Sequence, residues 1–133
     1  VLNHKEAQKA VDAVRYPPLG NRGVGLSRAQ HYGIGFDTYN EWVNSQSVVI
    51  VQIEHIDAVN NLESILNVEG VDGIIVGPYD LSSSLGKPGQ FNAPEVVEAI
   101  NQIEKVSSEF NKSLGFHVMP QTAAGGQPRL KLV

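Results

Sequence analysis

Two acidic side chains follow short apolar runs in this sequence, and a carboxamide stands just before the first of them. The run VVIVQIE, residues 48–54, ends in Gln52 and Glu54, and the run GIIVGPYD, residues 73–80, ends in Asp80. Carboxylates with room left for water and substrate oxygens are the ligands that Mg²⁺ and Mn²⁺ prefer. The pattern therefore indicates a divalent-metal site, and the alternative is that both carboxylates cap the helices that follow.

The apolar runs that carry these residues are typical of β-strands. Residues 48–54 are rich in β-branched side chains and nearly continuous in their apolarity, which predicts a strand covered on both faces. Residues 73–76 predict a second strand, and SLGFHVM, residues 113–119, predicts a third. Because side chains alternate along a strand, Gln52 and Glu54 are expected to point to the same side.

Three helices are expected around these strands, and each begins with a polar residue that can cap its first turn. The expected caps are Asn3 with Glu6 three residues on, Asp57, and Asn92 with Glu95 three residues on. Gly70 is expected to take the left-handed conformation that ends the second helix. The glycine-rich residues 19–35 are predicted to form a long ordered loop, and residues 120–133 a tail that is poorly ordered or depends on a neighbour.

Helices alternating with strands through short connections predict parallel βαβ units and therefore an α/β fold. Two architectures use such units, an open doubly wound sheet and a closed TIM (β/α)8 barrel, and the alternation alone is compatible with both. Both bind ligands at the carboxyl ends of their strands. Glu54 and Asp80 follow strand ends in this prediction, so they remain the leading candidates for a site.

Composition narrows the class of ligand. The formal net charge is −4 with no basic stripe, so neither nucleic acid nor an acidic membrane surface is an expected partner. No apolar run approaches the roughly 20 residues needed to cross a bilayer, and we expect a cytoplasmic protein that acts on a small molecule. The sequence has no cysteine, which excludes disulfides, thiolate catalysis and zinc–thiolate sites.

Two blocks of the sequence resemble one family. VQIEHIDAVNNLESILNVEGVDGIIVGPYDLSSSLGKPGQFNAPEV and RYPPLGNRGVG are similar to the HpcH/HpaI aldolase family, the class II pyruvate aldolases related to citrate lyase β chains. The resemblance implies part of a TIM barrel over residues 1–119, from helix four to strand seven of the full fold. An eightfold barrel takes roughly 250 residues, so we expect a fragment, a truncated product, or one of two chains that complete a barrel.

The resemblance also implies roles for individual residues. Glu54 and Asp80 fall on the metal ligands of the family, with Mg²⁺, Mn²⁺ or Co²⁺ as the ion, and Gln52 on the glutamine that contacts the oxo acid. The backbone amides of Tyr79 and Asp80 correspond to those that hold the pyruvate carboxylate. Tyr79 stands where family members commonly have alanine, so its phenol would narrow the pocket or hydrogen-bond a substrate.

The implied activity is cleavage of a 4-hydroxy-2-oxo acid to pyruvate and an aldehyde through a metal-stabilised enolate, by a homo-oligomer. The family's histidine base and carboxylate-clamping arginine precede the matched blocks, so this chain alone is expected to be inactive. A CoA-ester lyase of the citrate lyase type and a non-catalytic half-barrel that binds a partner chain are the two alternatives.

Two other side chains are candidates for a catalytic role. His117 lies inside the third predicted strand and could replace the missing base, the alternative being a histidine hydrogen-bonded in or beside the core. Arg22, in the glycine-rich segment, could approach a phosphate or carboxylate, the alternative being a solvent-facing or intersubunit arginine. Tyr39 and Trp42 are expected to pack rather than to bind a ligand.

Overall fold

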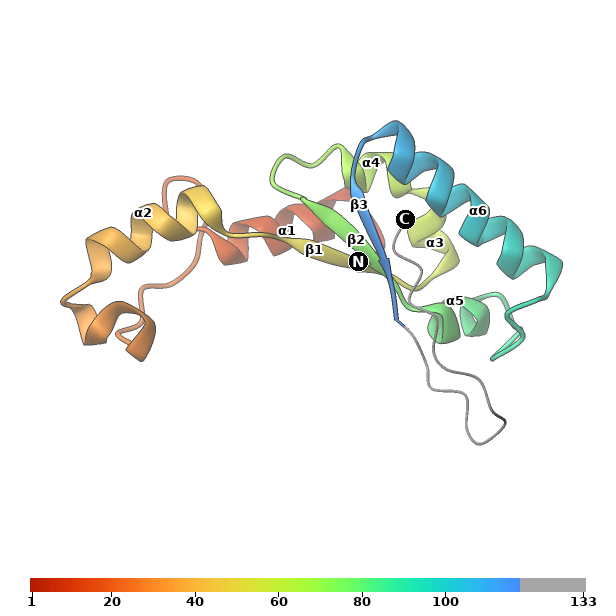
Figure 1. Ribbon diagram of the computed structural model, residues 1–133, viewed down its shortest axis with the longest axis horizontal. Coiled ribbons are helices and arrows are strands. Elements are labelled where there is room, and N and C mark those ends of the chain that lie inside the picture. Colours follow the sequence, from red (N-terminus) through yellow and green to blue (C-terminus); the bar gives the residue numbers. More distant parts are fainter. Residues whose placement is uncertain (118–133) are drawn as a thin grey trace.

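Three short parallel strands form the centre of the computed structural model, which describes residues 1–117 (Figure 1). The strands are β1 (Ile50–Ile53), β2 (Gly73–Val76) and β3 (Ser113–Phe116), in the order β1-β2-β3. Their register places Ile50 beside Gly73 and Gly73 beside Ser113. The second strand has its predicted bounds, and the first is shorter than predicted at both ends. The third begins at its predicted residue, Ser113, while residues 118–119 of that prediction and the predicted tail, residues 120–133, lie outside the described residues.

Helices connect neighbouring strands, as parallel pairing requires. The helices of the described residues are α1 (His4–Val14), a 3₁₀ helix (Arg28–Gly33), α2 (Phe36–Gln46), α3 (Ile56–Asn60), α4 (Leu62–Leu66), α5 (Pro78–Ser84) and α6 (Pro94–Glu109). The first three precede β1. α3 and α4 join β1 to β2, and α5 and α6 join β2 to β3. Within the described part of the chain, no helix combines the length and the apolarity needed to span a membrane.

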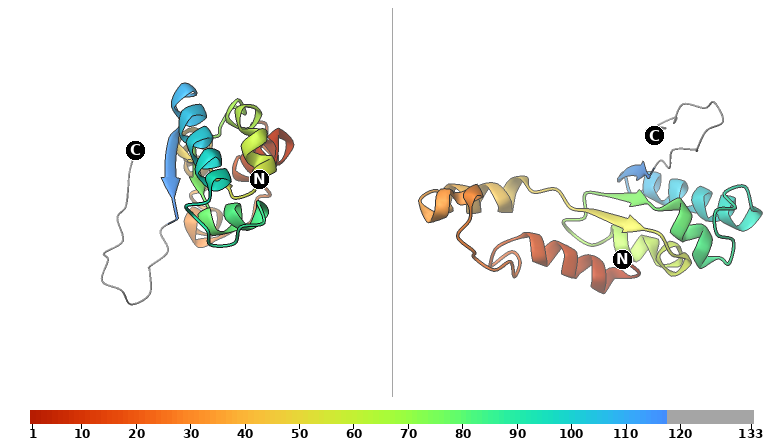
Figure 2. Two further views of the ribbon diagram at one scale, coloured as in Figure 1. Left: turned by 90° about the vertical axis from the view of Figure 1, so that its right-hand side faces the viewer. Right: turned by 90° about the horizontal axis from the view of Figure 1, so that it is seen from below.

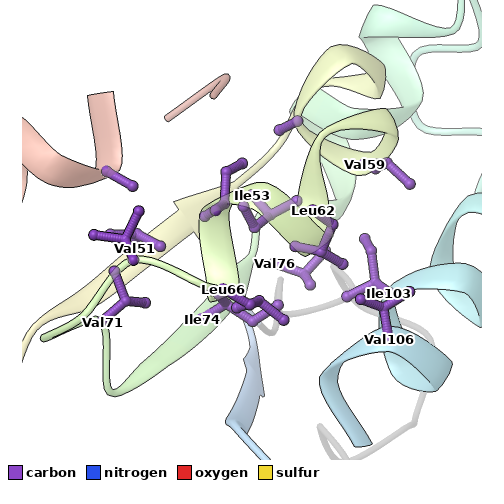
Figure 3. Packing of buried hydrophobic residues seen from close by; sticks show 14 of the residues in the cluster. Val51, Ile53, Val59, Leu62, Leu66, Val71, Ile74, Val76, Ile103 and Val106 are labelled. Atoms are coloured by element: carbon purple, nitrogen blue, oxygen red, sulfur yellow. The ribbon is translucent and has the colours of Figure 1, made fainter. Parts of the chain in front are cut away.

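The helices α1, α3, α4 and α6 all lie on one side of the sheet (Figure 2). Strand side chains that point into this layer, such as Val51 and Ile53, are buried there against helix residues that include Leu62 and Ile103 (Figure 3). On the opposite face Ile50 is 48% exposed. The prediction that the first strand is covered on both faces is therefore wrong for residues 1–117, because no described element packs over the second face.

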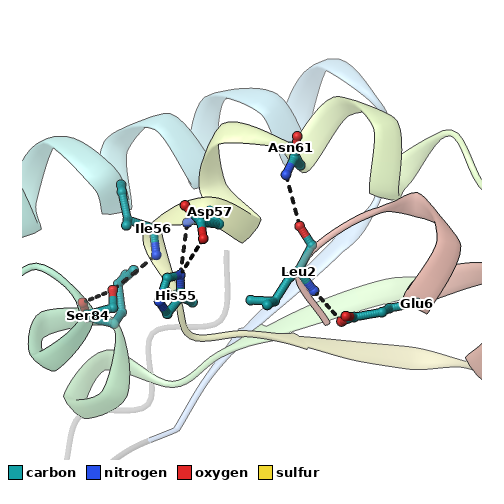
Figure 4. Close-up of polar contacts among 8 residues, drawn as sticks. Leu2, Glu6, His55, Ile56, Asp57, Asn61 and Ser84 are labelled. Atoms are coloured by element: carbon teal, nitrogen blue, oxygen red, sulfur yellow. Dashed lines mark hydrogen bonds and ion pairs between the residues drawn. The ribbon is translucent and has the colours of Figure 1, made fainter.

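The predicted start of the first helix is confirmed. Asn3 Oδ1 accepts hydrogen bonds from the backbone N–H groups of Lys5 (3.0 Å) and Glu6 (3.2 Å). Glu6 Oε2 in turn accepts from the Leu2 N–H at 2.8 Å (Figure 4). These bonds satisfy backbone donors that have no partner within the helix, so the chain enters α1 in a defined direction.

The predicted cap at Asp57 is wrong, because the helix begins two residues earlier than a cap at Asp57 requires. His55 precedes α3, and its Nδ1 accepts from the Asp57 N–H at 3.1 Å (Figure 4). The Ile56 N–H donates to Ser84 Oγ at 3.0 Å. A histidine and a serine from α5 therefore satisfy the backbone donors at the start of α3.

The start of α6 also differs from prediction. Ala93, not Asn92, precedes the helix, and no side chain caps it. Pro94 begins the helix as expected, since its fixed φ suits the first position and its missing N–H has no intrahelical partner there. Gly70 has a φ of +95°, as predicted, but it does not end the helix, because α4 ends at Leu66 with Asn67 as its cap.

The segment 16–47, which we call the arm, projects away from the sheet (Figure 1). Its core is the buried Tyr16, whose ring meets those of Phe36 (5.4 Å) and Tyr39 (6.4 Å) edge-on. Tyr39 stacks on Trp42 at 6.1 Å, so both residues pack as expected. The arm contains the 3₁₀ helix within the predicted loop, and α2, which the sequence analysis did not predict.

Candidate functional site

The candidate site lies where β1 and β2 end. Ile53 pairs with Val76, and the Gly77 N–H donates to the Ile53 carbonyl at 3.1 Å. Pairing therefore continues past the strand ends and places Glu54 beside Gly77. This backbone bond gives the first acidic residue a defined position at the carboxyl edge of the sheet.

Gln52 and Glu54 lie together on the sheet face that the helices do not cover. Ile53 between them is fully buried on the helix side, whereas Gln52 and Glu54 are half-buried. Gln52 Nε2 donates a hydrogen bond to Glu54 Oε2. The expectation that both side chains share a face is therefore confirmed, and the amide orients the carboxylate.

Gly77 provides the space that these two side chains occupy. A Cβ atom added at Gly77 would lie 3.0 Å from Glu54 Oε2 and 3.2 Å from Gln52 Nε2. The φ of −98° is open to any residue, so glycine is needed here for room and not for its backbone freedom. This role of Gly77 was not predicted from the sequence, although a glycine directly after the second strand, where the first strand ends in an acidic residue, is a signal for it.

Asp80 lies in the first turn of α5, one turn after Gly77, and its side chain is exposed. The Leu81 N–H donates to the Gly77 carbonyl at 2.9 Å, which closes that turn. Neither acidic residue is a helix cap, since Gly77 precedes α5 and His55 precedes α3. The alternative that both carboxylates serve as caps is therefore wrong.

The donor set suits a hard divalent cation. Within residues 1–117, no three His, Asp or Glu side chains are grouped closely enough to hold a metal by themselves. Mg²⁺ commonly takes one or two carboxylates and completes its shell with water and substrate oxygens. Glu54 and Asp80 offer ligands of that kind, with the Gln52 amide next to the first carboxylate.

The ring of Tyr79 borders the loop that follows α5. It is 47% exposed, and its Cε2 lies 3.5 Å from where a Cβ of Gly89 would stand. The loop is attached to α5 by the Gly89 N–H, which donates to Ser82 Oγ at 3.0 Å, and by the Lys87 N–H, which donates to the Ser82 carbonyl at 2.8 Å. Tyr79 therefore stands beside a loop that is itself hydrogen-bonded to the helix.

His117 reaches the same edge of the sheet from β3. Its N–H donates to the Val76 carbonyl at 2.9 Å, and Phe116 before it packs against the core. Alternation along the strand then puts His117 on the face of Gln52 and Glu54. Its side chain is exposed, so the interpretation of His117 as a histidine in or beside the core is wrong, since nothing described covers that face.

Arg22 does not join this site. Its guanidinium lies over the rings of Tyr16 (4.9 Å) and Tyr39 (5.6 Å), and Nη2 donates to Tyr39 Oη at 3.3 Å. The arm that holds it lies at the opposite end of the sheet from α5 (Figure 1). Arg22 is therefore packed inside the arm, and the structure brings together Gln52, Glu54 and Gly77 with neither Arg22 nor any other described arginine among their contacts.

Comparison with known proteins finds relatives for nearly the whole chain. The family model described as HpcH/HpaI aldolase/citrate lyase matches residues 1–123. A 4-hydroxy-2-oxo-heptane-1,7-dioate aldolase of Shigella flexneri is 44% identical over 126 residues, which cover 93% of this chain and 47% of that protein. A 2-keto-3-deoxy-L-rhamnonate aldolase of Salmonella dublin is 42% identical over 122 residues, which cover 90% of this chain and 45% of that protein.

The fold has the same relatives. The crystal structure of an HpcH/HpaI aldolase from Desulfitobacterium hafniense superposes with a TM-score of 0.79 at 33% identity, over 92% of this chain and 48% of that one. The chain therefore spans about half the length of the proteins it matches. Its parallel strands and helices form part of a TIM barrel, as predicted, and not of an open doubly wound sheet.

Proposed function

This chain belongs to the HpcH/HpaI aldolase/citrate lyase family, and on that premise we propose that it holds the metal and the oxo acid in a metal-dependent aldolase. The reaction is cleavage of a 4-hydroxy-2-oxo acid to pyruvate and an aldehyde. The observation that supports it most is the group of Gln52, Glu54 and Gly77 at the carboxyl edge of the sheet, with Asp80 one turn further on. TIM-barrel enzymes place their active sites at that edge.

Each residue has a separate task in this proposal. Glu54 and Asp80 bind the cation, Mg²⁺, Mn²⁺ or Co²⁺, and Gln52 keeps the Glu54 carboxylate in position while its amide contacts the oxo acid. The backbone amides of Tyr79 and Asp80 hold the carboxylate of the pyruvate half. When bound, the cation supplies Lewis-acid stabilisation of the negative charge that develops as the carbon–carbon bond breaks.

Cleavage also needs a group that takes the proton of the substrate hydroxyl. Within residues 1–117 we assign no side chain to that step, and we propose that another part of a complete barrel performs it. The chain would then bind metal and oxo acid but would not turn over by itself. A homo-oligomer and a cytoplasmic location stay predictions on the same basis.

Calorimetric titration with Mn²⁺, followed by oxalate or pyruvate, tests this proposal. Glu54→Gln and Asp80→Asn should lose Mn²⁺ binding because each removes a charged ligand. Glu63→Gln makes the same chemical change at an exposed position of α4 and should bind as the unaltered protein does. Binding that is absent in the unaltered protein, or unchanged in both site variants, would contradict the metal site.

The substrate class is tested separately. The matched relatives named above are aldolases, which supports a hydroxy-oxo acid over a CoA ester. Calorimetric binding of a 4-hydroxy-2-oxo acid in the presence of Mn²⁺, compared with binding of an acyl-CoA by the same preparation, distinguishes the two without a requirement for turnover. Binding of the acyl-CoA alone would replace the aldolase proposal with the lyase.

A further inference from the structure

The open sheet face carries a second polar side chain opposite Glu54, with Gly77 between them. The register of the three strands continues one residue past their ends. Glu54, which follows β1, and His117, which follows β3, therefore lie on either side of Gly77, which follows β2. Neighbouring strands lie about 4.8 Å apart, so the three residues form one row across the edge of the sheet. The central member of that row has no side chain.

The Glu54 carboxylate lies close to the space over Gly77. Its Oε2 lies 3.0 Å from the place that a Cβ of Gly77 would take, so the carboxylate stands over the glycine and not over the outer edge of β1. His117 lies on the other side of the same glycine. Its side chain is on the same face as Glu54, because Phe116 before it packs against the core and side chains alternate along a strand. A small ligand held beside Glu54 therefore has the imidazole as its neighbour across Gly77.

The backbone keeps His117 at this position. Its N–H bond to the Val76 carbonyl at 2.9 Å extends the ladder that pairs β3 with β2. The side chain is exposed. It therefore contributes little to the stability of the fold, and its polar ring is accessible to a ligand. A neutral imidazole has one N–H donor and one acceptor nitrogen, which suits it to the oxygen-rich ligand that the proposed function brings here.

We propose that His117 is a substrate-contacting residue, which donates a hydrogen bond to an oxygen of the bound 2-oxo acid from the β3 side of the site. This inference rests on the proposed function and deepens it. Gln52 and Glu54 would contact the ligand from β1, and His117 would contact it from β3, with the ligand above Gly77. The role is one of binding, and it adds no ligand to the cation.

Oxalate binding in the presence of Mn²⁺ tests the inference without a requirement for turnover. His117→Leu removes the donor, and His117→Gln keeps an N–H group in a side chain of similar reach. His4→Leu, at an exposed position of α1, is the matched control. Far-UV circular dichroism and thermal unfolding of each variant verify that the fold is retained.

The expected pattern separates the two kinds of contact. Affinity for Mn²⁺ should be the same in all three variants and in the unaltered protein. Affinity for oxalate should fall about tenfold in His117→Leu, as loss of one hydrogen bond predicts. In His117→Gln and in His4→Leu it should stay within about threefold of the unaltered value.

Two outcomes would overturn the inference, and they differ in what else they affect. If oxalate binds equally well to His117→Leu and to the unaltered protein, while Glu54→Gln loses Mn²⁺, then His117 has no contact with the ligand and the proposed function stands. If the unaltered protein binds no Mn²⁺, the proposed function fails and this inference fails with it.

Discussion

Glu54 at the edge of the sheet and Arg22 in the arm are both charged residues in segments whose sequences suggested a functional site. The structure places them in different surroundings. Arg22 lies over two tyrosine rings and donates to Tyr39 Oη at 3.3 Å and to the Val14 carbonyl at 3.5 Å. Glu54 is positioned by strand pairing and by one amide, on a face that no described element covers.

The difference shows how a structural charge can be distinguished from a candidate ligand. In the arm the guanidinium lies over the rings of Tyr16 and Tyr39, so its interactions stabilise the arm. At the sheet edge the backbone places the carboxylate, so the side chain is not needed for packing. Substitutions in the arm should therefore change stability without changing ligand binding, and substitutions at the edge should do the reverse.

The largest effect is expected from Tyr16→Ala. Tyr16 is 2% exposed and is the ring against which Phe36, Tyr39 and Arg22 pack. Removal of a buried aromatic ring costs about 3–5 kcal/mol, so the free energy of unfolding in urea should fall by that amount. Tyr16→Phe keeps the ring and loses only the bond to Gln30, and should cost about 1 kcal/mol. A large loss of Mn²⁺ affinity in the folded Tyr16→Phe variant would break the comparison.

Gly77→Ala should affect metal binding rather than stability. The added methyl group would lie 3.0 Å from Glu54 Oε2, and the carboxylate must move to admit it. We expect affinity for Mn²⁺ to fall about tenfold, in the range measured when groups that orient metal ligands are altered. Calorimetry would measure it.

Gly23→Ala is the matched control for that substitution. No atom lies within 4 Å of a Cβ built at Gly23, which stands in the arm, so neither stability nor Mn²⁺ affinity should change. Equal affinities for Mn²⁺ in Gly77→Ala and Gly23→Ala would show that the space over Gly77 does not determine the position of the Glu54 carboxylate.

Arg22→Met should lower stability by about 1 kcal/mol, because it removes a cation–π contact with Tyr16 and keeps much of the aliphatic volume. Thermal unfolding would detect the change. Affinity for Mn²⁺ should be unaltered. A variant that unfolds normally but binds Mn²⁺ or oxalate more weakly would restore Arg22 as a functional residue.

The smallest effect is expected from Gln52→Leu. The substitution removes the hydrogen bond that orients Glu54 but leaves both proposed carboxylate ligands in place. Loss of one neutral orienting bond suggests a loss of about threefold in Mn²⁺ affinity. A loss as complete as that of Glu54→Gln, measured in the same titration, would show that Gln52 itself binds the cation.

Local patterns predicted the elements that carry the strongest local signals. The bounds of β2, Gly73–Val76, follow from a short apolar run that ends at Gly77 and Pro78. α2 was missed because only Val43 among its residues is buried, so its apolar pattern is weak and the arm's aromatic cluster stabilises it instead. The expected cap at Asp57 was wrong because α3 begins directly after His55, whose own side chain caps it. The expected cap at Asn92 was wrong because α6 begins at Pro94, directly after Ala93, and no side chain caps it.

The placement of Gln52 and Glu54 on one face needed only the sequence, because alternation along a strand is a property of the covalent backbone. The space over Gly77, the exposure of His117 and the packing of Arg22 needed the tertiary structure. Each depends on which strand pairs with which residue, and on what covers a face. Such non-local contacts join segments far apart in the chain, and no local pattern specifies them.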